Sequence, residues 1–202
     1  MITKRGIRYR GVSGLLALGL CIVVTGRLAG QGATPTNAQA DDAAAFKDFT
    51  VRVQAYLKLQ KTVESSLPAL KPTDLPEMIT AHQQALARKI REARPNAKAG
   101  DIFTPAVCEA FRRASRAALA GPHAAESRAF MGQDAPDPNM RLVVNGVYPG
   151  TEPRAALTPG LLAAFPPLPV EVAYRVVGRT LILIDVKSRM VVDIARLILP
   201  PA

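Results

Sequence analysis

The hydrophobic pattern of this 202-residue chain changes character between residues 132 and 139. Before that stretch, apolar residues recur every three or four positions, the period of an amphipathic helix. After it, β-branched residues gather in short runs typical of strands. The stretch itself is rich in Gly, Pro, Asp and Asn and predicts a loop. Helices and strands are therefore segregated, which predicts an α+β fold rather than a parallel sheet of repeated strand–helix units.

The first half predicts a region of three helices. They cover Asp41 to about Ser66, about 74–94, and about 104–120. Asp74 and Thr104 are the predicted N-caps of the second and third helices, and each is followed by a proline in the first turn. The predicted buried faces are Phe46, Phe49, Val53, Tyr56, Val63 and Leu67 in the first helix (broken by Gln60), Met78, Ile79, His82, Leu86, Ile90 and Ala93 in the second, and Val107, Phe111, Ala114, Ala118 and Leu119 in the third.

The second half predicts a short helix and a three-stranded antiparallel β-meander. Thr158–Phe165 has the cap, proline and apolar residues of a two-turn helix. Three β-branched runs, separated by two turn signals, then predict the meander. These strands are expected at Val170–Val177, Thr180–Val186 and Met190–Ile194, after a further short helical piece at Ala124–Phe130 and a strand-like turn over Arg141–Tyr148 centred on Asn145-Gly146.

The N-terminus predicts export from the cytoplasm. Four basic residues, Lys4, Arg5, Arg8 and Arg10, precede an uncharged apolar stretch at 11–26. This is the pattern of a secretory signal, and the stretch is shorter than the roughly 20 residues that span a membrane. Cleavage is expected after Ala40 or near 30–33, and an uncleaved membrane anchor is the alternative. The head contains no Arg-Arg pair, so we expect the general secretory route and a periplasmic or extracellular location.

These patterns divide the chain into three parts. Residues 1–40 are the predicted signal peptide and a short linker, 41–131 form the helical region, and 140–202 form the β-rich region. The two later regions are expected to pack together as one domain, because about 160 residues suffice for one hydrophobic core.

The basic charge belongs largely to the predicted signal. The whole chain carries a formal charge of +10, but its first forty residues hold five of the 26 basic residues and none of the 16 acidic ones, which leaves 21 against 16, or +5. No basic cluster interleaved with aromatic residues is present, so a nucleic-acid partner is not expected. The densest basic run, Arg88-Lys89-x-Arg91-x-x-Arg94, predicts a solvated helix face. The expected partner is an unidentified protein or other envelope component, with membrane contact only during export or if the N-terminus is retained.

The number of cysteines rules out a stabilising disulfide in the expected mature chain. Removal of the signal removes Cys21 and leaves Cys108 alone, so no intramolecular disulfide can form. Cys108 falls within the third helical pattern and is expected to be a buried structural thiol.

No catalytic or metal-binding motif is present, and no cofactor is expected. The weak catalytic candidates are the carboxylates of Asp185 and Asp193, with Glu171 as a third. If the second turn of the meander centres on Ser188, Leu183 faces Asp193, Asp185 faces Val191, and the two aspartates are diagonal neighbours on one sheet face. Such a pair can perform acid–base chemistry when burial raises one pKa. The favoured interpretation is a solvated face, on which Arg175, Arg179 and Arg189 pair with these carboxylates.

The weak metal-ligand candidates are Met78 and His82. Their i,i+4 spacing places a thioether and an imidazole on one helix face. Two ligands do not complete a site, so the favoured interpretation is a buried helix face.

Several segments resemble those of small exported bacterial proteins grouped only as domains of unknown function. At the C-terminus they are Tyr174-Arg175-x-Val177-Gly178-x-x-Leu181-x-Leu183-x-Asp185 and Val191-Val192-Asp193-Ile194; nearer the N-terminus they are Leu67-Pro68-x-Leu70-Lys71-Pro72-Thr73-Asp74 and Gly100-Asp101-Ile102-Phe103-Thr104-Pro105. The resemblance implies export and supplies no activity, ligand or residue roles.

The function expected from the sequence is that of a non-enzymatic exported protein that acts by binding. Nucleophile-elbow, Cys-x-x-Cys, His-Glu-x-x-His and phosphate-loop motifs are absent from the sequence. The outer strands of the small sheet are candidate edges for an added partner strand. The alternatives are a carboxylate-dependent envelope hydrolase or transferase and a membrane-tethered structural protein.

Overall fold

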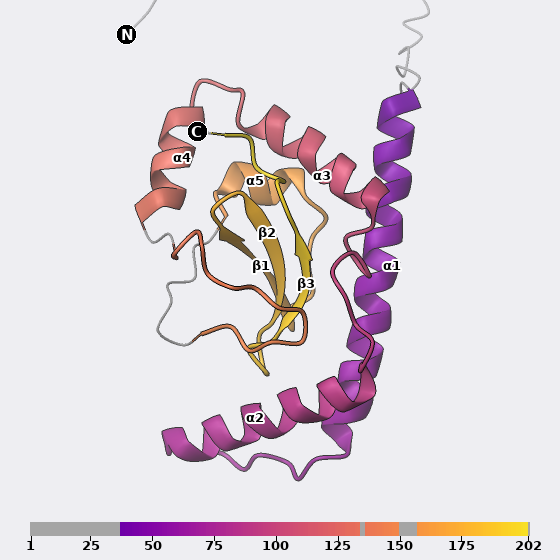
Figure 1. Cartoon of the computed structure of the whole chain (residues 1–202), viewed down its shortest axis with the longest axis vertical. Helices are drawn as coiled ribbons and strands as arrows, with labels where there is room; N and C mark the ends of the chain where they lie inside the picture. Colours follow the sequence, from indigo (N-terminus) through magenta and orange to yellow (C-terminus); the bar gives the residue numbers. More distant parts are fainter. Residues whose placement is uncertain (1–36, 134–135, 150–156, 202) are drawn as a thin grey trace, which may run out of the picture. The chain divides into compact units, whose positions relative to one another are not determined.

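The computed structural model describes residues 37–133, 136–149 and 157–201 (Figure 1). The predicted signal core and the cleavage positions near 30–33 lie outside these residues. The predicted cleavage position after Ala40 lies in the first turns of a described helix whose residues 37–40 are all exposed. Within the described ranges, no helix combines the length and apolar character needed to cross a membrane.

The α+β class and the order of elements predicted from the sequence are confirmed (Figure 1). The helices are α1 Asn37–Ser65, α2 Pro76–Ala93, α3 Pro105–Ala118, α4 Ala124–Gln133 and α5 Pro159–Ala164, and the strands are β1 Val172–Val177, β2 Thr180–Asp185 and β3 Val191–Ala195. The predicted caps of α3 and α5 are also confirmed, because Thr104 accepts a hydrogen bond from the Val107 N–H and Thr158 accepts one from the Leu161 N–H. Each is followed by proline at the start of its helix, where no N–H is needed.

The long helix α1 packs one face against the sheet and α3. Phe49, Val53 and Tyr56 are buried on that face, as the apolar spacing predicts. Gln60, which interrupts the apolar pattern in the sequence, is itself fully buried on the same face. The amide of Gln60 has no hydrogen-bond partner in the described part of the chain, and the fold gives no physical account of it.

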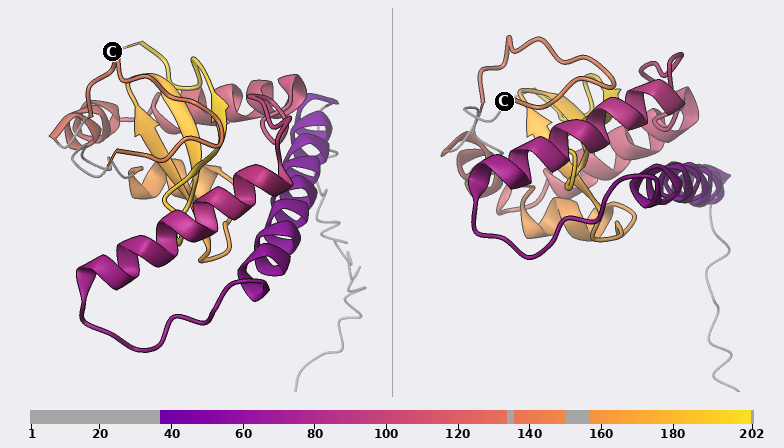
Figure 2. Two further views of the ribbon diagram at one scale, coloured as in Figure 1. Left: turned by 60° about the horizontal axis from the view of Figure 1, so that its bottom comes forward. Right: turned by 90° about the horizontal axis from the view of Figure 1, so that it is seen from below.

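The predicted start and buried face of α2 require correction. The N-cap is Leu75 rather than Asp74, and no side chain caps the helix. The buried residues are Leu86, Ala87 and Ile90, all in the second half of the helix. The predicted core residues Met78, Ile79 and Ala93 are exposed. Figure 2 shows the reason: α2 crosses beyond the end of the sheet, so its first half has no partner layer.

The meander is confirmed, with strand order β1-β2-β3. The predicted pair Leu183–Asp193 is present, but the predicted pair Asp185–Val191 is wrong. Val191 instead faces Ile184, because a β-bulge shifts the register between Leu183 and Ile184. A bulge places one extra residue opposite its partner and bends the strand.

The turn predicted at Asn145-Gly146 is present, but the strand-like residues on its two sides do not pair with each other. Asn145 takes a positive φ of 63° within a turn closed by the hydrogen bond from the Gly146 N–H to the Val143 carbonyl. The segment then runs beside the outer edge of β3. Asn145 N–H donates to the Val191 carbonyl at 2.8 Å, and Val191 N–H donates to the Gly146 carbonyl at 2.8 Å. The backbone groups of this turn therefore form hydrogen bonds with the sheet. These bonds occupy part of the outer edge of β3.

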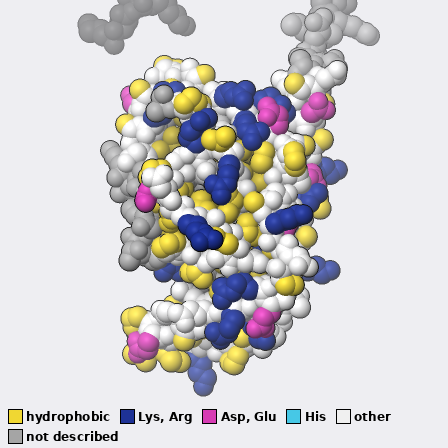
Figure 3. Space-filling view, viewed as in Figure 1, with side chains coloured by type: hydrophobic (Ala, Val, Ile, Leu, Met, Phe, Trp, Pro, Cys, Tyr) yellow, Lys and Arg dark blue, Asp and Glu magenta, His cyan; other side chains and the backbone are white. Residues whose placement is uncertain are grey.

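One hydrophobic core joins the helical half to the sheet. At its centre are aromatic rings from α1, α3, β1 and the intervening loops, with centroids 4.6–6.0 Å apart. The rings belong to Phe49, Phe103, Phe111, Phe165 and Tyr174. A smaller cluster, including Tyr148, Ile182 and Ile194, covers the opposite face of the sheet. On the face shown in Figure 3, Lys and Arg side chains are spread over the surface rather than joined in one patch.

Candidate functional site

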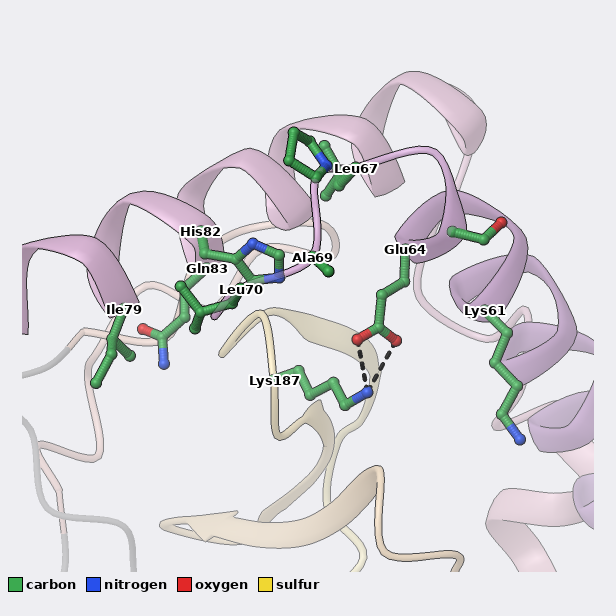
Figure 4. Close-up of a pocket in the computed structure, with 11 residues that line it drawn as sticks. Lys61, Glu64, Leu67, Ala69, Leu70, Ile79, His82, Gln83 and Lys187 are labelled. Atoms are coloured by element: carbon green, nitrogen blue, oxygen red, sulfur yellow. Dashed lines mark hydrogen bonds and ion pairs between the residues drawn. The ribbon is translucent and has the colours of Figure 1, made fainter. Parts of the chain in front are cut away.

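The structure contains a groove of about 720 Å³ (Figure 4). It lies where the end of α1, the connection at residues 66–75, the first half of α2 and the β2–β3 turn come together. The connection runs outward from the end of α1 to the distant start of α2, and α2 then returns toward α1 across the end of the sheet (Figure 2). The groove therefore exists because α2 overhangs the end of the sheet.

Most of the exposed area of the groove wall is apolar, and five of its eleven residues have apolar side chains. They are Leu67, Pro68, Ala69, Leu70 and Ile79. Leu70 and Ile79 remain 39% and 38% exposed. Apolar side chains that remain accessible inside a concave site are characteristic of small-molecule pockets.

Polar groups stand at the rim of the groove. Lys187 Nζ, from the β2–β3 turn, lies 2.6 and 2.8 Å from the two carboxylate oxygens of Glu64, near the end of α1 (Figure 4). Lys61 Nζ lies 3.6 Å from a Glu171 oxygen, beyond hydrogen-bonding distance. His82 and Gln83 line the groove from α2. The Glu64–Lys187 pair is partly solvated, so its contribution to stability is modest, ~0.2–1 kcal/mol.

A buried polar anchor fixes α1 to the β2–β3 turn beside the groove. The Tyr56 hydroxyl donates to Asp185 Oδ2 at 2.7 Å, and the Ser188 N–H donates to Asp185 Oδ1 at 2.8 Å. Burial raises the pKa of the Tyr56 phenol, and the Asp185 carboxylate raises it further. Tyr56 therefore remains a protonated donor. The Arg94 guanidinium lies 5.0 Å from the centroid of the Tyr56 ring and adds a cation–π contact.

Asp193 is held by backbone amides at the start of α3. Its Oδ1 accepts from the Gly100 and Ile194 N–H groups at 2.9 and 2.7 Å. Its Oδ2 accepts from the Ile102 and Phe103 N–H groups at 2.6 and 2.7 Å. Gly100 adopts a φ of +93°, a conformation that side-chain-bearing residues rarely take. Four N–H donors satisfy this buried charge, so Asp193 ties the loop before α3 to the sheet.

The interpretation of the aspartate candidates as a solvated face is wrong. Asp185 and Asp193 are both fully buried, and their oxygens are occupied by donors of the fold itself. The predicted arginine pairs are also absent, because the described ion pairs of these carboxylates include none with Arg175, Arg179 or Arg189. The sequence periodicity placed the two residues on one face, but it carried no information about the helices that cover that face.

The weak metal candidates are only partly brought to one place. His82 lines the groove, whereas Met78 is 51% exposed. Across the described ranges, no group of three or more His, Cys, Asp or Glu side chains is arranged to hold a metal ion.

Cys108 is half-buried, and its thiol donates to the Phe103 carbonyl at 3.2 Å. Burial raises the pKa of the Cys108 thiol, which disfavours the reactive thiolate. The geometry therefore fits the structural role predicted for it.

The basic run on α2 is not wholly a solvated face. Arg88, Lys89 and Arg91 are exposed, but Arg94 is half-buried. Besides covering Tyr56, Arg94 accepts a hydrogen bond from the Asn145 side chain at 2.8 Å through its carbonyl. It connects the end of α2 to the segment that borders β3.

The groove itself was missed by sequence reasoning. In the sequence, the connection that forms one wall, Leu67–Asp74, is marked only by its resemblance to segments of small exported bacterial proteins. The available signal was the exposed apolar content of this proline-containing connection together with Met78 and Ile79, which a buried helix face explained equally well.

Comparisons of this chain with protein-family models, with curated proteins and with solved structures each found no match.

Proposed function

We propose that this protein is a non-enzymatic binding protein that acts outside the cytoplasm and holds a small, largely apolar molecule in the groove between α1, residues 66–75 and α2. The observation that carries the proposal is the groove's volume of about 720 Å³ together with its apolar wall. Small-molecule sites are commonly clefts of ~300–1,000 Å³, lined by apolar groups with a few polar groups that orient the ligand. Location outside the cytoplasm rests on the basic and apolar N-terminal pattern.

The sheet edges are less suited to binding than the sequence suggests. Part of the β3 edge is already paired with residues 145–148. On β1, Tyr174 and Val176 are 5% and 4% exposed, so these two positions offer little accessible backbone to an added strand. These observations favour the groove over strand addition.

The hydrolase or transferase alternative has weaker support. Its principal carboxylates accept hydrogen bonds from Tyr56 and from backbone amides, and neither Asp185 nor Asp193 lines the groove. Asp185 borders only a cavity of about 30 Å³, enough for a water molecule but not for a substrate.

Binding of N-phenyl-1-naphthylamine, a neutral apolar dye that fluoresces when shielded from water, tests the proposal. We expect the dye to bind saturably to the protein purified from its host cell, with the N-terminus that it carries there. The double variant Leu70→Gln/Ile79→Gln should weaken the affinity about tenfold, because ~1.4 kcal/mol of apolar contact is removed. Both residues are already partly exposed, so the melting temperature should change little.

The control is Val51→Gln, which alters another exposed apolar residue, 59% exposed on α1 and outside the groove. Its dye affinity should equal that of the unaltered protein. Absence of saturable binding, or equal affinity in the double variant, would contradict the proposal.

A further inference from the structure

The side chains that line the groove carry more positive than negative charge. Its charged side chains are two ammonium groups, Lys61 and Lys187, and one carboxylate, Glu64. Both oxygens of that carboxylate already accept from Lys187. A cationic ligand would therefore meet two positive charges and one carboxylate that is in use.

Three carbonyls in the last turn of α1 are already used as acceptors within the chain. The last carbonyls of a helix normally present unpaired acceptors and partial negative charge. In this protein the Thr62 carbonyl accepts from Ser65 Oγ at 2.8 Å, and the Val63 carbonyl accepts from the Ser66 N–H at 3.1 Å. The Glu64 carbonyl accepts from the Leu67 N–H at 3.0 Å. The backbone acceptors of residues 62–64, at the end of α1, are thus satisfied by the chain itself.

Donor capacity, in contrast, remains. An ammonium group has three N–H donors, and Lys187 directs its described bonds to a single carboxylate. Lys61 is only 3.6 Å from its nearest carboxylate oxygen, too far for a good hydrogen bond. The side chains of His82 and Gln83 form no hydrogen bond with any described residue, and Figure 4 shows them projecting from α2 on the same side as Leu70.

We propose that the molecule held in the groove is an amphipathic anion, with a carboxylate- or sulfonate-type head group received by Lys187 and Lys61 and an apolar body against Leu70 and Ile79. This inference rests on the proposed function and adds the charge of the ligand to it. The head group would accept a hydrogen bond from Lys187 while the Lys187–Glu64 ion pair stays intact. Its remaining oxygens would accept from Lys61 or from the polar side chains of α2.

The test compares two dyes that share one apolar body. 1-Anilinonaphthalene-8-sulfonate is N-phenyl-1-naphthylamine with an added sulfonate, so their affinity ratio isolates the head group. We expect the sulfonate dye to bind about fivefold to tenfold more tightly at low salt, with the difference shrinking as salt screens the lysines. Lys187→Gln and Lys61→Gln should each reduce the ratio of sulfonate-dye affinity to neutral-dye affinity at least threefold.

Two further variants separate head-group recognition from other effects. Lys187→Arg keeps the charge and should retain the preference for the sulfonate dye. Lys89→Gln removes a lysine from the exposed face of α2, where it pairs with Glu92 outside the groove, and should behave as the unaltered protein.

The outcomes distinguish this inference from the proposed function. Equal affinities for the two dyes, or a preference that survives both Lys→Gln substitutions, would overturn the anionic head group while the apolar groove stands. Failure of both dyes to bind would remove the proposed function as well.

Discussion

At the scale of single residues, the buried aspartates show how a polar side chain organises distant segments. Asp193 accepts hydrogen bonds from the N–H groups of Gly100, Ile102 and Phe103. Asp185 accepts one from the Tyr56 hydroxyl on α1 and one from the Ser188 N–H in its own turn. A buried carboxylate is tolerated only when such donors replace water. Each aspartate therefore selects the one arrangement of loop, helix and sheet that satisfies it.

The substitution Asp193→Asn measures this role. Asn keeps one acceptor oxygen but presents an N–H₂ group to two of the four backbone donors, so at least two buried N–H groups lose their partner. At ~1–3 kcal/mol for each unsatisfied group, the free energy of unfolding should fall by about 3–5 kcal/mol in chemical denaturation. Asp48→Asn, which alters a partly exposed pair with Arg52, should change it by less than ~1 kcal/mol. Equal effects of the two substitutions would show that Asp193 is not the anchor of this loop.

At the scale of elements, α2 divides into two halves with different roles. Its second half buries Leu86 and Ile90 against the core, whereas its first half overhangs the sheet and supplies Ile79, His82 and Gln83 to the groove. An apolar residue in the overhanging half contributes little to folding because it has no partner layer. It is available to a ligand instead.

A pair of alanine substitutions tests this division. Leu86→Ala removes a fully buried side chain and should lower the free energy of unfolding by ~2–5 kcal/mol. Met78→Ala removes a side chain that is half exposed and should change it by less than ~0.5 kcal/mol. Denaturant melts of the two variants provide the measurement. A large effect of Met78→Ala would restore the buried helix face predicted from the sequence and would argue against an overhanging first half.

At the scale of the whole molecule, the groove joins parts of the chain that are far apart in sequence. Glu64 and Lys187 are separated by 123 positions, and their ion pair closes one end of the cavity. The buried hydrogen bond between Tyr56 and Asp185 also joins α1 to the end of β2. The shape of the groove therefore depends on the packing of α1 against the sheet rather than on a local motif.

The state of the N-terminus is the prediction that belongs to this scale. We expect the intact mass of the protein, recovered from fractionated host cells, to match a chain that starts at Asp41 or near residues 31–34, in the soluble exported fraction. Cleavage after Ala40 would remove only the first, exposed turn of α1 and leave Asp42 to pair with Arg113 on α3. A full-length mass in the membrane fraction would contradict cleavage and make residues 11–26 an anchor.

The sequence by itself determined the local structure of this protein. Helix period, β-branched runs and the caps at Thr104 and Thr158 predicted the α+β class, because these signals depend on neighbouring residues alone. The same signals failed where a distant segment decided the outcome. The register near Asp185 is changed by a bulge, and Asn145-Gly146 bonds to β3 instead of forming a hairpin.

Only the tertiary structure decided burial and the site. Asp185 and Asp193 are buried because α1 and the loop before α3 cover their sheet face, and no periodicity within the strand records that cover. Met78 and Ile79 are exposed because α2 extends beyond the sheet. The groove follows from that overhang: its wall consists of ordinary apolar residues that become a binding surface only where packing leaves them without a partner.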